Sequence, residues 1–347
     1  MIWIWIGFIL FVLAMLALDL GVFHRKAHVV SVREALIWSG VWVALALAFG
    51  AFVYFGYENH WLGLGNTLDA VDGAINDGES ATVKYITGYI IEKSLSVDNI
   101  FVIAMLFGFF AVPAIYQHRV LFWGILGALV MRGAMIGIGA ELIARYHWIL
   151  YIFGGFLILT AAKMLLLKTD HTDPSKNLVV RFVKRLFPVT DHYDGEHFIV
   201  RSEPLPGRPR GRLMLTPLAL ALVMVETTDL IFAVDSIPAI FAITADPFLV
   251  FTSNVFAILG LRSLYFALAG LMDKFRYLKV ALAIVLAVVG VKMLIASWLK
   301  EMVGPNVNFY LLGLVLLILA LGVAASLLAG PKRGTMAGGE SHGGNRA

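Results

Sequence analysis

Acidic side chains interrupt several segments of this sequence that are otherwise apolar. The acids concerned are Asp19, Glu92, Asp98, Glu226, Asp229 and Asp235. A charged group at the centre of a bilayer costs at least ~2.5 kcal/mol on insertion scales, so such residues turn away from lipid and are functional by default. Carboxylate, amide and carbonyl oxygens suit a hard divalent ion such as Mg²⁺, Ca²⁺ or Mn²⁺. Because the sequence holds no cysteine for a softer metal, it predicts a site for a hard cation.

Two of these acids lie in a segment that occurs twice. Residues 96–100, SVDNI, resemble residues 233–237, AVDSI. When the aspartates of the two segments are aligned, Glu92 falls opposite Asp229, six residues earlier in each copy. An arginine and then a lysine follow each copy, 31 residues apart in the first and 30 in the second. These bases are Arg132 and Lys163, then Arg262 and Lys292.

The matched order predicts two copies of one unit of three transmembrane helices. An odd number of crossings reverses the direction of the chain, so the second copy is predicted to be inverted in the membrane, as in many secondary transporters. Repeat 1 is predicted at about 82–167 and repeat 2 at about 215–299, with a cytoplasmic loop at 168–214 between them. Both belong to a single transport domain, 1–329, and the glycine-rich tail 330–347 is predicted to be disordered.

The elements that must position these side chains are predicted to be membrane-spanning helices. Of the 347 residues, 60% are hydrophobic and only 14% are charged, and the mean hydropathy is +0.85, so a bilayer is the expected solvent. A helix needs about 20 apolar residues to cross the hydrocarbon layer. Nine segments qualify: about 2–23, 34–57, 82–110, 118–141, 147–167, 215–244, 247–271, 277–299 and 308–329. The predicted fold class is therefore an all-α polytopic membrane protein.

Lysine and arginine collect in alternate connections between these spans. They concentrate in the first, fifth and seventh connections and in the C-terminal tail, whereas the second connection is acidic. This bias predicts that the N-terminus is outside and the C-terminus is in the cytoplasm. The same distribution argues against a nucleic-acid partner, despite a pI near 9.2. Within the fifth connection, residues 177–187 alternate apolar and basic residues at helical spacing, which predicts a helix on the inner membrane surface.

The predicted metal ligands are Glu92, Asp98, Asn99, Glu226, Asp229 and Asp235. Glu226 stands opposite Tyr89 of the first copy, so three roles stay open for it: ligand, proton carrier or ion-pair partner. Positions six residues apart point to different sides of an unbroken helix. Because Pro238 cannot donate a backbone hydrogen bond, it frees the carbonyl of Val234 beside Asp235, and the helix is predicted to bend or open there.

The bases within the spans have a plainer expected role. Arg132, Lys163, Arg262 and Lys292 are predicted to form structural ion pairs, because a fixed cation repels a cationic substrate. Asp19 lies near the cytoplasmic end of the first span. It is a candidate for a gate or a proton path, and pairing with Arg25 is the alternative.

Several motifs resemble those of the TerC/Alx family of bacterial integral membrane proteins. They are LDLGVFHR at 18–25, EKSLSVDNIF at 92–101, ETTDLIFAVDSIP at 226–238, TSN at 252–254 and GLR at 260–262. Members of that family are associated with manganese export and tellurium resistance, and are grouped with the LysE-type transporter superfamily. The resemblance therefore implies export of Mn²⁺ across the bacterial inner membrane. It also implies that Glu92, Asp98, Asp229 and Asp235 match the acidic motif positions of the family.

The leading hypothesis is thus a secondary exporter of Mn²⁺ that works by alternating access between the repeats. The ion is the transported substrate, and no cofactor is expected. The alternative is a membrane interaction protein that supports metal loading of secreted enzymes or tellurium resistance through its 168–214 loop. An enzyme is not expected, because no nucleophile motif and no HExxH motif is present, and the lack of a P-loop leaves ATP drive unsupported.

Overall fold

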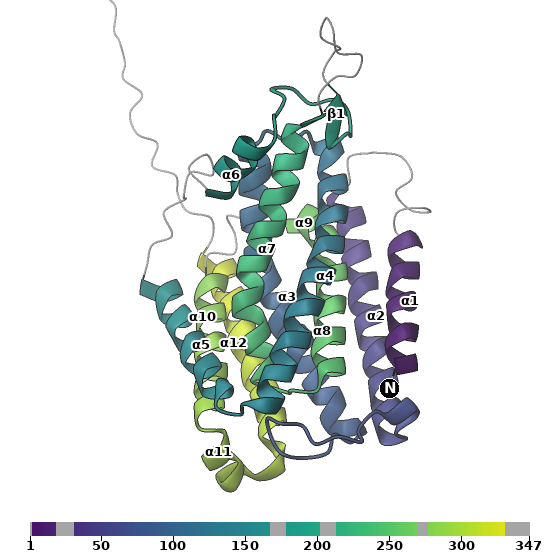
Figure 1. Ribbon diagram of the computed structural model, residues 1–347. Helices are drawn as coiled ribbons and strands as arrows, with labels where there is room; N and C mark the ends of the chain where they lie inside the picture. The colour runs from purple at the N-terminus through teal and green to yellow at the C-terminus, as the bar shows by residue number, and fades with distance from the viewer. Residues whose placement is uncertain (1, 19–30, 167–177, 202–212, 269–276, 330–347) are drawn as a thin grey trace, which may run out of the picture.

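The computed structural model describes residues 2–18, 31–166, 178–201, 213–268 and 277–329. Within these ranges the chain forms a bundle of long helices that run up and down one common direction (Figure 1). The helices are α1 (Ile2–Leu18), α2 (Val32–Glu58), α3 (Gly78–Phe109), α4 (Ala114–Arg145), α5 (Ile149–Leu166), α6 (Leu178–Leu186), α7 (Pro217–Phe241), α8 (Pro247–Leu259), α9 (Leu261–Leu268), α10 (Leu278–Leu294), α11 (Ala296–Val303) and α12 (Val307–Ala329). Strands β1 (Ile199–Arg201) and β2 (Leu213–Leu215) form one small antiparallel sheet.

Six segments among the described residues are long and apolar enough to cross a bilayer: α2, α4, α5, α7, α8 with α9, and α12. Each of the nine predicted spans contains at least one helix; the seventh holds α8 and α9, and the eighth holds α10 and the start of α11. The three that do not meet the same criteria are α1 and α10, which are 17 residues long, and α3, which carries four charges between Lys84 and Asp98. The all-α, multi-pass membrane architecture is therefore confirmed.

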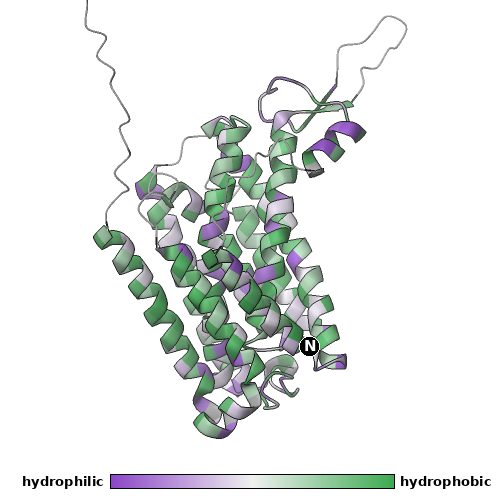
Figure 2. Cartoon of the chain, turned by 90° about the vertical axis from the view of Figure 1, so that its left-hand side faces the viewer, coloured by the Kyte–Doolittle hydropathy of each residue, from purple (hydrophilic) through white to green (hydrophobic). Residues whose placement is uncertain are grey.

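The exterior of the bundle is apolar over most of its length, as Figure 2 shows by the hydropathy of each residue. Large hydrophobic side chains point outward, among them Leu317 and Leu321 of α12, which are 55% and 61% exposed. An exposed apolar surface of this extent is typical of a membrane-contacting face. The hydrophilic residues gather at the two ends and along the inside of the bundle (Figure 2).

Local sequence explains where the central helices begin. Asp77 caps α3 in a capping box, because its carboxylate accepts from the backbone N–H of Ser80 at 2.8 Å and the Ser80 hydroxyl accepts from the N–H of Asp77. Thr216 caps α7, and Asp246 caps α8, each directly before a proline at the first helical position. The caps at Asp77 and Thr216 hold the first turns of α3 and α7, the helices that carry the intramembrane acids.

The predicted opening of the helix at Pro238 is wrong. Helix α7 continues through Pro238 and ends one turn later, at Phe241. The break lies instead in the seventh predicted span, where Gly260 separates α8 from α9. A β carbon at Gly260 would lie 3.2 Å from the Trp42 β carbon and 2.5 Å from Lys93 Nζ, so glycine lets Trp42 and the Lys93 side chain approach this break closely.

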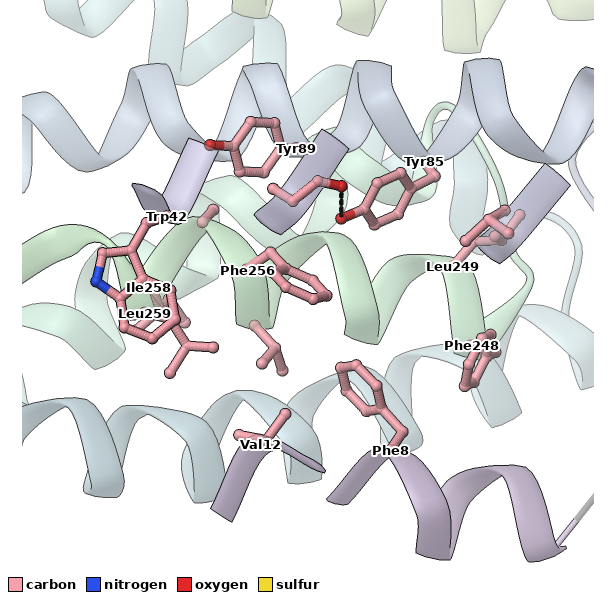
Figure 3. Packing of buried hydrophobic residues seen from close by; sticks show 14 of the residues in the cluster. Phe8, Val12, Trp42, Tyr85, Tyr89, Phe248, Leu249, Phe256, Ile258 and Leu259 are labelled. Atoms are coloured by element: carbon pink, nitrogen blue, oxygen red, sulfur yellow. Dashed lines mark hydrogen bonds between the residues drawn. The ribbon is translucent and has the colours of Figure 1, made fainter. Parts of the chain in front are cut away.

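The helices pack in pairs that join distant parts of the chain. The most extensive contact is between α5 and α10, followed by α3 with α8, α2 with α3, and α4 with α7. An aromatic cluster fills the space between α1, α2, α3 and α8, with the rings of Phe49 and Phe256 4.8 Å apart. Figure 3 shows this packing and the hydrogen bond, 3.0 Å long, that Tyr85 donates to the carbonyl of Ala46.

The connection between α5 and α7 lies at one end of the bundle, and α11 lies at the other end (Figure 1). The helix predicted at 177–187, in the connection between α5 and α7, is present as α6. The described part is held to the bundle by the ion pair of Arg119 with Glu196, at 2.5 Å, and by a hydrogen bond from Tyr193 to the carbonyl of Phe110. The small sheet of β1 and β2 also belongs to this connection. Predictions for Asp19 and for the tail 330–347 fall outside the described residues.

Candidate functional site

The centre of the bundle is organised around Arg132 of α4. Its guanidinium donates twice to Asp229 of α7, from Nε at 3.1 Å and from Nη2 at 2.8 Å, and Nη1 donates to Glu92 of α3. Nη1 also lies 2.8 Å from the Oδ1 atom of Asn254 in α8. Arg132 and Glu92 are fully buried, and the Asp229 side chain is 12% exposed. The two acids aligned by the repeat therefore meet on one base.

This arrangement leaves negative charge in excess. One guanidinium faces two carboxylates, and the bidentate geometry with Asp229 is the strongest form of such a pair. The second Glu92 oxygen, Oε2, is buried without a hydrogen-bond partner among the described residues. Buried carboxylate oxygens are normally satisfied, so this one is available to a ligand or to water.

Glu226 lies three residues before Asp229, on the same side of α7. It packs directly over Gly127 of α4, where any β carbon would overlap its carboxylate. Its Oε2 atom is also buried and has no hydrogen-bond partner in the described part of the chain. Two carboxylate oxygens, one of Glu92 beside Arg132 and one of Glu226 beside Asp229, therefore have no partner among the described residues.

Three more unsatisfied oxygens belong to α3. The Tyr89 hydroxyl, the Ser96 hydroxyl and the Asn99 Oδ1 atom are all buried, and none has a hydrogen-bond partner within the described ranges. Hydroxyl, amide and carboxylate oxygens are the donor set that hard divalent cations prefer. However, no group of three or more His, Asp or Glu side chains in the described residues is close enough to hold a metal ion. These oxygen atoms are of the chemical type that such an ion prefers. Glu92 and Asp229 are paired with Arg132, and the acids of the described residues are not grouped as metal ligands.

Asp98 and Asp235 have different neighbours. Asp235 of α7 accepts a hydrogen bond of 3.0 Å from Thr160 of α5 and interacts electrostatically with Lys163, a turn further along α5. Asp98 of α3 interacts electrostatically with Lys279 at the start of α10. Each of these acids therefore turns away from the Arg132 centre toward the third helix of the opposite copy. This agrees with the expectation that acids six positions apart leave an unbroken helix on different sides.

Two of the buried lysines, Lys93 and Lys292, bind helix ends instead of acids. Lys93 donates to the carbonyl of Ala257 at 3.1 Å, near the end of α8, and Lys292 donates to the carbonyl of Ala242 at 2.6 Å, at the end of α7. The last carbonyls of a helix carry partial negative charge, so a cation stabilises them. Arg262 is buried and has partners, whereas Lys163 is exposed. The matched bases of the two copies therefore differ in environment.

A second buried polar cluster was not predicted from the sequence. Lys84 of α3 donates to Asp69 at 2.9 Å and to Asn76 at 2.6 Å, and forms an ion pair with Asp72 at 2.7 Å. Asp69 also accepts from Thr244 and, at 2.8 Å, from the backbone N–H of Ala245. We call Asp69, Asn76, Lys84 and Thr244 the latch. It ties the connection between α2 and α3 to the turn between α7 and α8.

The sequence contained part of the information that predicts the latch. Lys84 stands within the third apolar span, and the acids of the preceding connection are close to it in sequence. Thr244, which donates to Asp69, is 175 residues away from it in the sequence. An uncharged threonine in a turn does not indicate a buried polar contact. Tyr57 and Asp246 form a neighbouring buried hydrogen bond of 2.8 Å.

A cavity of about 440 Å³ adjoins the latch. It is lined by residues 70–77, by the turn before α5, by the end of α10 and by the start of α12. Its polar lining includes Asp72, Asn76 and Lys292. Two of these are partners of Lys84, so the latch forms part of the cavity wall.

The pKa of Asp69 predicts how the latch responds to pH. Burial alone would raise the pKa of Asp69, but Lys84, Thr244 and the N–H of Ala245 together hold it below its usual value. A lowered pKa in the folded state stabilises the fold above the ordinary aspartate pKa of about 3.9, and the stabilisation is lost as pH falls through the lowered value. The other titratable groups facing Asp69 are Tyr57, Asp72, Lys84, Asp246 and Lys292.

We therefore expect Asp69→Asn to lower thermal stability in detergent by a constant amount from pH 5 to 7. The difference from the parent should shrink below pH ~3.9. Melting followed by intrinsic fluorescence across this range measures it. A difference that grows as the pH falls would contradict the assigned charge state.

The chain matches one family model and several named proteins. A family model described as "Integral membrane protein TerC family" matches residues 77–333. A protein of Myxococcus xanthus, named an uncharacterized membrane protein, is 49% identical over 325 residues, 94% of this chain and 92% of that protein. Alx of Escherichia coli K12, whose name describes a candidate membrane-bound redox modulator, is 47% identical over 297 residues, 85% of this chain and 86% of Alx. Alx of Photorhabdus laumondii is 42% identical over 327 residues, 94% of this chain and 92% of that protein. No solved structure matches the chain.

Proposed function

The chain belongs to the TerC family of integral membrane proteins, and from this premise we propose that it is a secondary transporter, not an enzyme, that exports a divalent cation from the cytoplasm. We propose Mn²⁺ as its main substrate, on the family resemblance. The observation that carries the proposal is the set of unsatisfied buried oxygens on Tyr89, Glu92, Ser96, Asn99 and Glu226. A buried group without a partner is costly, so such a set is retained where a ligand completes it.

The packing of the helices supports the proposed inverted repeat. The first helix of each copy packs on the second helix of the other: α3 on α8 and α7 on α4. The third helices, α5 and α10, pack on each other, and Asp98 and Asp235 face the third helix of the opposite copy. An exchange of this kind is what a two-fold axis in the membrane plane between two three-helix units produces. In this proposal α1, α3 and α10 cross the membrane too, which makes nine spans.

We propose that the N-terminus is outside and the C-terminus in the cytoplasm of a bacterial inner membrane. The bases of the connections between α1 and α2, α5 and α7, and α9 and α10 support this orientation. The connection between α2 and α3, with Asp69 and Asp72, is then outside. The cavity next to the latch belongs to the same, outer end.

In the mechanism we propose, Arg132 neutralises the acids of the site when the transported ion is not bound to them. In the arrangement described here, its guanidinium neutralises Glu92 and Asp229, which come from opposite repeats. A divalent cation brings two positive charges to the same oxygens and would release Arg132 from at least one acid. Asp98 and Asp235, on the inner and outer sides of this centre, would receive and release the ion as the two repeats rock. Protonation of the carboxylates offers a route for coupling to a proton gradient.

Reconstitution into liposomes with a metal-sensing dye tests the proposal. Mn²⁺, Ca²⁺, Mg²⁺ and Zn²⁺ are compared for the parent, for Asp98→Asn and for Asp235→Asn. Loss of a charged ligand costs about 1.5–3 kcal/mol, so we expect Mn²⁺ transport to fall roughly tenfold or more in each variant. The matched control is Glu141→Gln, an exposed acid on α4 paired with Arg145. If both aspartate variants move Mn²⁺ like the parent, the assignment of the pathway is wrong.

A second function class is favoured by the connection between α5 and α7. Helix α6 exposes Phe182 and Leu186 beside basic residues, which is a surface that a partner protein could bind. The chain would then be an interaction protein that supports metal loading or tellurium resistance. Thiol exchange by the chain itself is excluded, because none of its 347 residues is cysteine. Deletion of residues 178–201 separates the classes: an autonomous exporter keeps its transport of Mn²⁺ in liposomes after the deletion, whereas a docking protein loses its cellular phenotype.

A further inference from the structure

The latch lies between the outer cavity and the intramembrane acids. Along α3, Lys84 precedes Glu92 by eight residues, which is about 12 Å of helix. Along α7, Ala242 follows Asp235 by seven residues, or about 10 Å. The latch residue Thr244 and the cavity residue Lys292, which binds the carbonyl of Ala242, are at this same level. A cation leaving the acids toward the cavity would have to pass this layer.

We propose that Lys84 and Asp69 form the outer gate of the pathway, closed in the arrangement described here. The inference rests on the proposed function, since a gate has meaning only for a transporter. Lys84 is 1% exposed and the Asp69 side chain 0%, so the pair is sealed from water. The charge of Lys84 is compensated by Asp69 at 2.9 Å and by Asp72 at 2.7 Å, so the closely packed contact of these buried side chains is what blocks a cation. The gate therefore opens when Lys84 and the connection that carries Asp69 separate from the turn between α7 and α8.

The contacts of Asp69 explain why the opening is a single event. Its two oxygens bind Lys84 of α3, Thr244 and the N–H of Ala245 at once. Moving α3 and the connection that carries Asp69 away from the turn between α7 and α8 breaks the two bonds from Thr244 and Ala245 together, while Lys84 stays on Asp69. The first helix of repeat 1 and the first helix of repeat 2 are α3 and α7, so the rocking of one repeat against the other acts directly on the latch. Losing both hydrogen bonds from a buried carboxylate is costly, and this cost holds the gate closed until an ion binds.

A crosslink tests this gate, because the chain has no native cysteine. The side chains of Asp69 and Thr244 are in hydrogen-bond contact, so Asp69→Cys with Thr244→Cys can be joined by a short reducible bis-thiosulfonate reagent. We expect Mn²⁺ transport in liposomes to fall at least tenfold on crosslinking and to return on reduction. The matched control is Ile199→Cys with Leu215→Cys, which are direct neighbours across β1 and β2 at the opposite end. Crosslinking this control pair should leave transport unchanged.

The outcomes separate the gate from the function. If the parent moves no divalent cation, the proposed function fails. If the parent transports and the crosslinked latch pair transports equally well, the gate proposal is overturned. Failure of the latch pair to crosslink, when the control pair crosslinks fully, also overturns it.

A second measurement does not depend on transport. Ser236 is 2% exposed and lies beneath the latch, next to Arg132. In a Ser236→Cys protein, a membrane-impermeant thiol reagent added outside should react slowly. Adding Lys84→Gln should raise the rate at least tenfold, because the gate then opens more often. An equal rate in the presence and absence of Lys84→Gln would contradict the gate.

Discussion

Replacing Arg132 with glutamine is expected to abolish transport and to lower stability by roughly 3–5 kcal/mol, the usual cost of breaking a buried ion pair. The substitution leaves Glu92 and Asp229 buried and uncompensated, where both now accept from the same guanidinium. Arg132 also joins α4 to Asn254 of α8, so the change weakens the contact between four helices. Thermal unfolding in detergent and Mn²⁺ flux in liposomes measure the two effects.

Two further variants separate charge from geometry. Arg132→Lys keeps the charge but cannot bind Asp229 through two nitrogens, so it should restore part of the stability and little of the transport. The double variant Arg132→Gln with Glu92→Gln removes one uncompensated acid and should be more stable than Arg132→Gln alone. Equal stability of the single and double variants would show that the pair of Arg132 with Glu92 does not hold the bundle.

Replacing Gly290 with leucine is expected to have the largest effect on folding outside the charged residues. A β carbon at Gly290 would lie 2.9 Å from the carbonyl oxygen of Gly154, and one at Gly154 would lie 3.1 Å from the carbonyl oxygen of Gly290. The clash is with backbone on a neighbouring helix, so it cannot be relieved by turning a side chain. Transmembrane helices commonly approach at such small residues. Because α5 and α10 make the most extensive contact of the bundle, the two repeats would be forced apart.

The cost should exceed the typical 1–3 kcal/mol of core overpacking, and the yield of folded protein should fall sharply. The matched control is Gly155→Leu. A β carbon at Gly155 has no atom within 4 Å, although the residue is next to Gly154 on the same helix. Size-exclusion chromatography and thermal melting of both variants measure the difference. Similar profiles for Gly290→Leu and Gly155→Leu would mean that the two helices do not touch as described.

The approximate positions of the long helices could be predicted from the sequence, because the length of an apolar segment is a local property. The predicted segments at 34–57 and 308–329 became α2 and α12 with their ends shifted by one or two residues. The prediction that the helix opens at Pro238 failed, because tertiary packing outweighed the local effect of the proline. Pro238 removes one hydrogen bond, yet α7 stays helical because residues 236–241 are buried among other helices.

The candidate acids could also be found from the sequence, since an intramembrane charge is visible in any hydropathy profile. Their alignment across the two copies predicted that Glu92 and Asp229 are equivalent, and both do bind Arg132. The sequence contained no reason to choose Arg132 over Lys93 as the common partner. Lys93 is adjacent to Glu92 in the chain, but its side chain leaves α3 in another direction and reaches the carbonyl of Ala257.

By itself, then, the sequence determined the membrane class, the order of the helices, the repeated acids and the absence of thiol chemistry. All of these depend on residue types and on spacing along the chain. The tertiary structure alone decided the partner of each charge: Arg132 for Glu92 and Asp229, Thr160 for Asp235, and Lys84 with Thr244 for Asp69. The latch and the contact of Gly154 with Gly290 join positions more than 100 residues apart. Such partners are set by the direction in which each side chain leaves its helix and by how closely two helices approach, and neither is a property of a single segment.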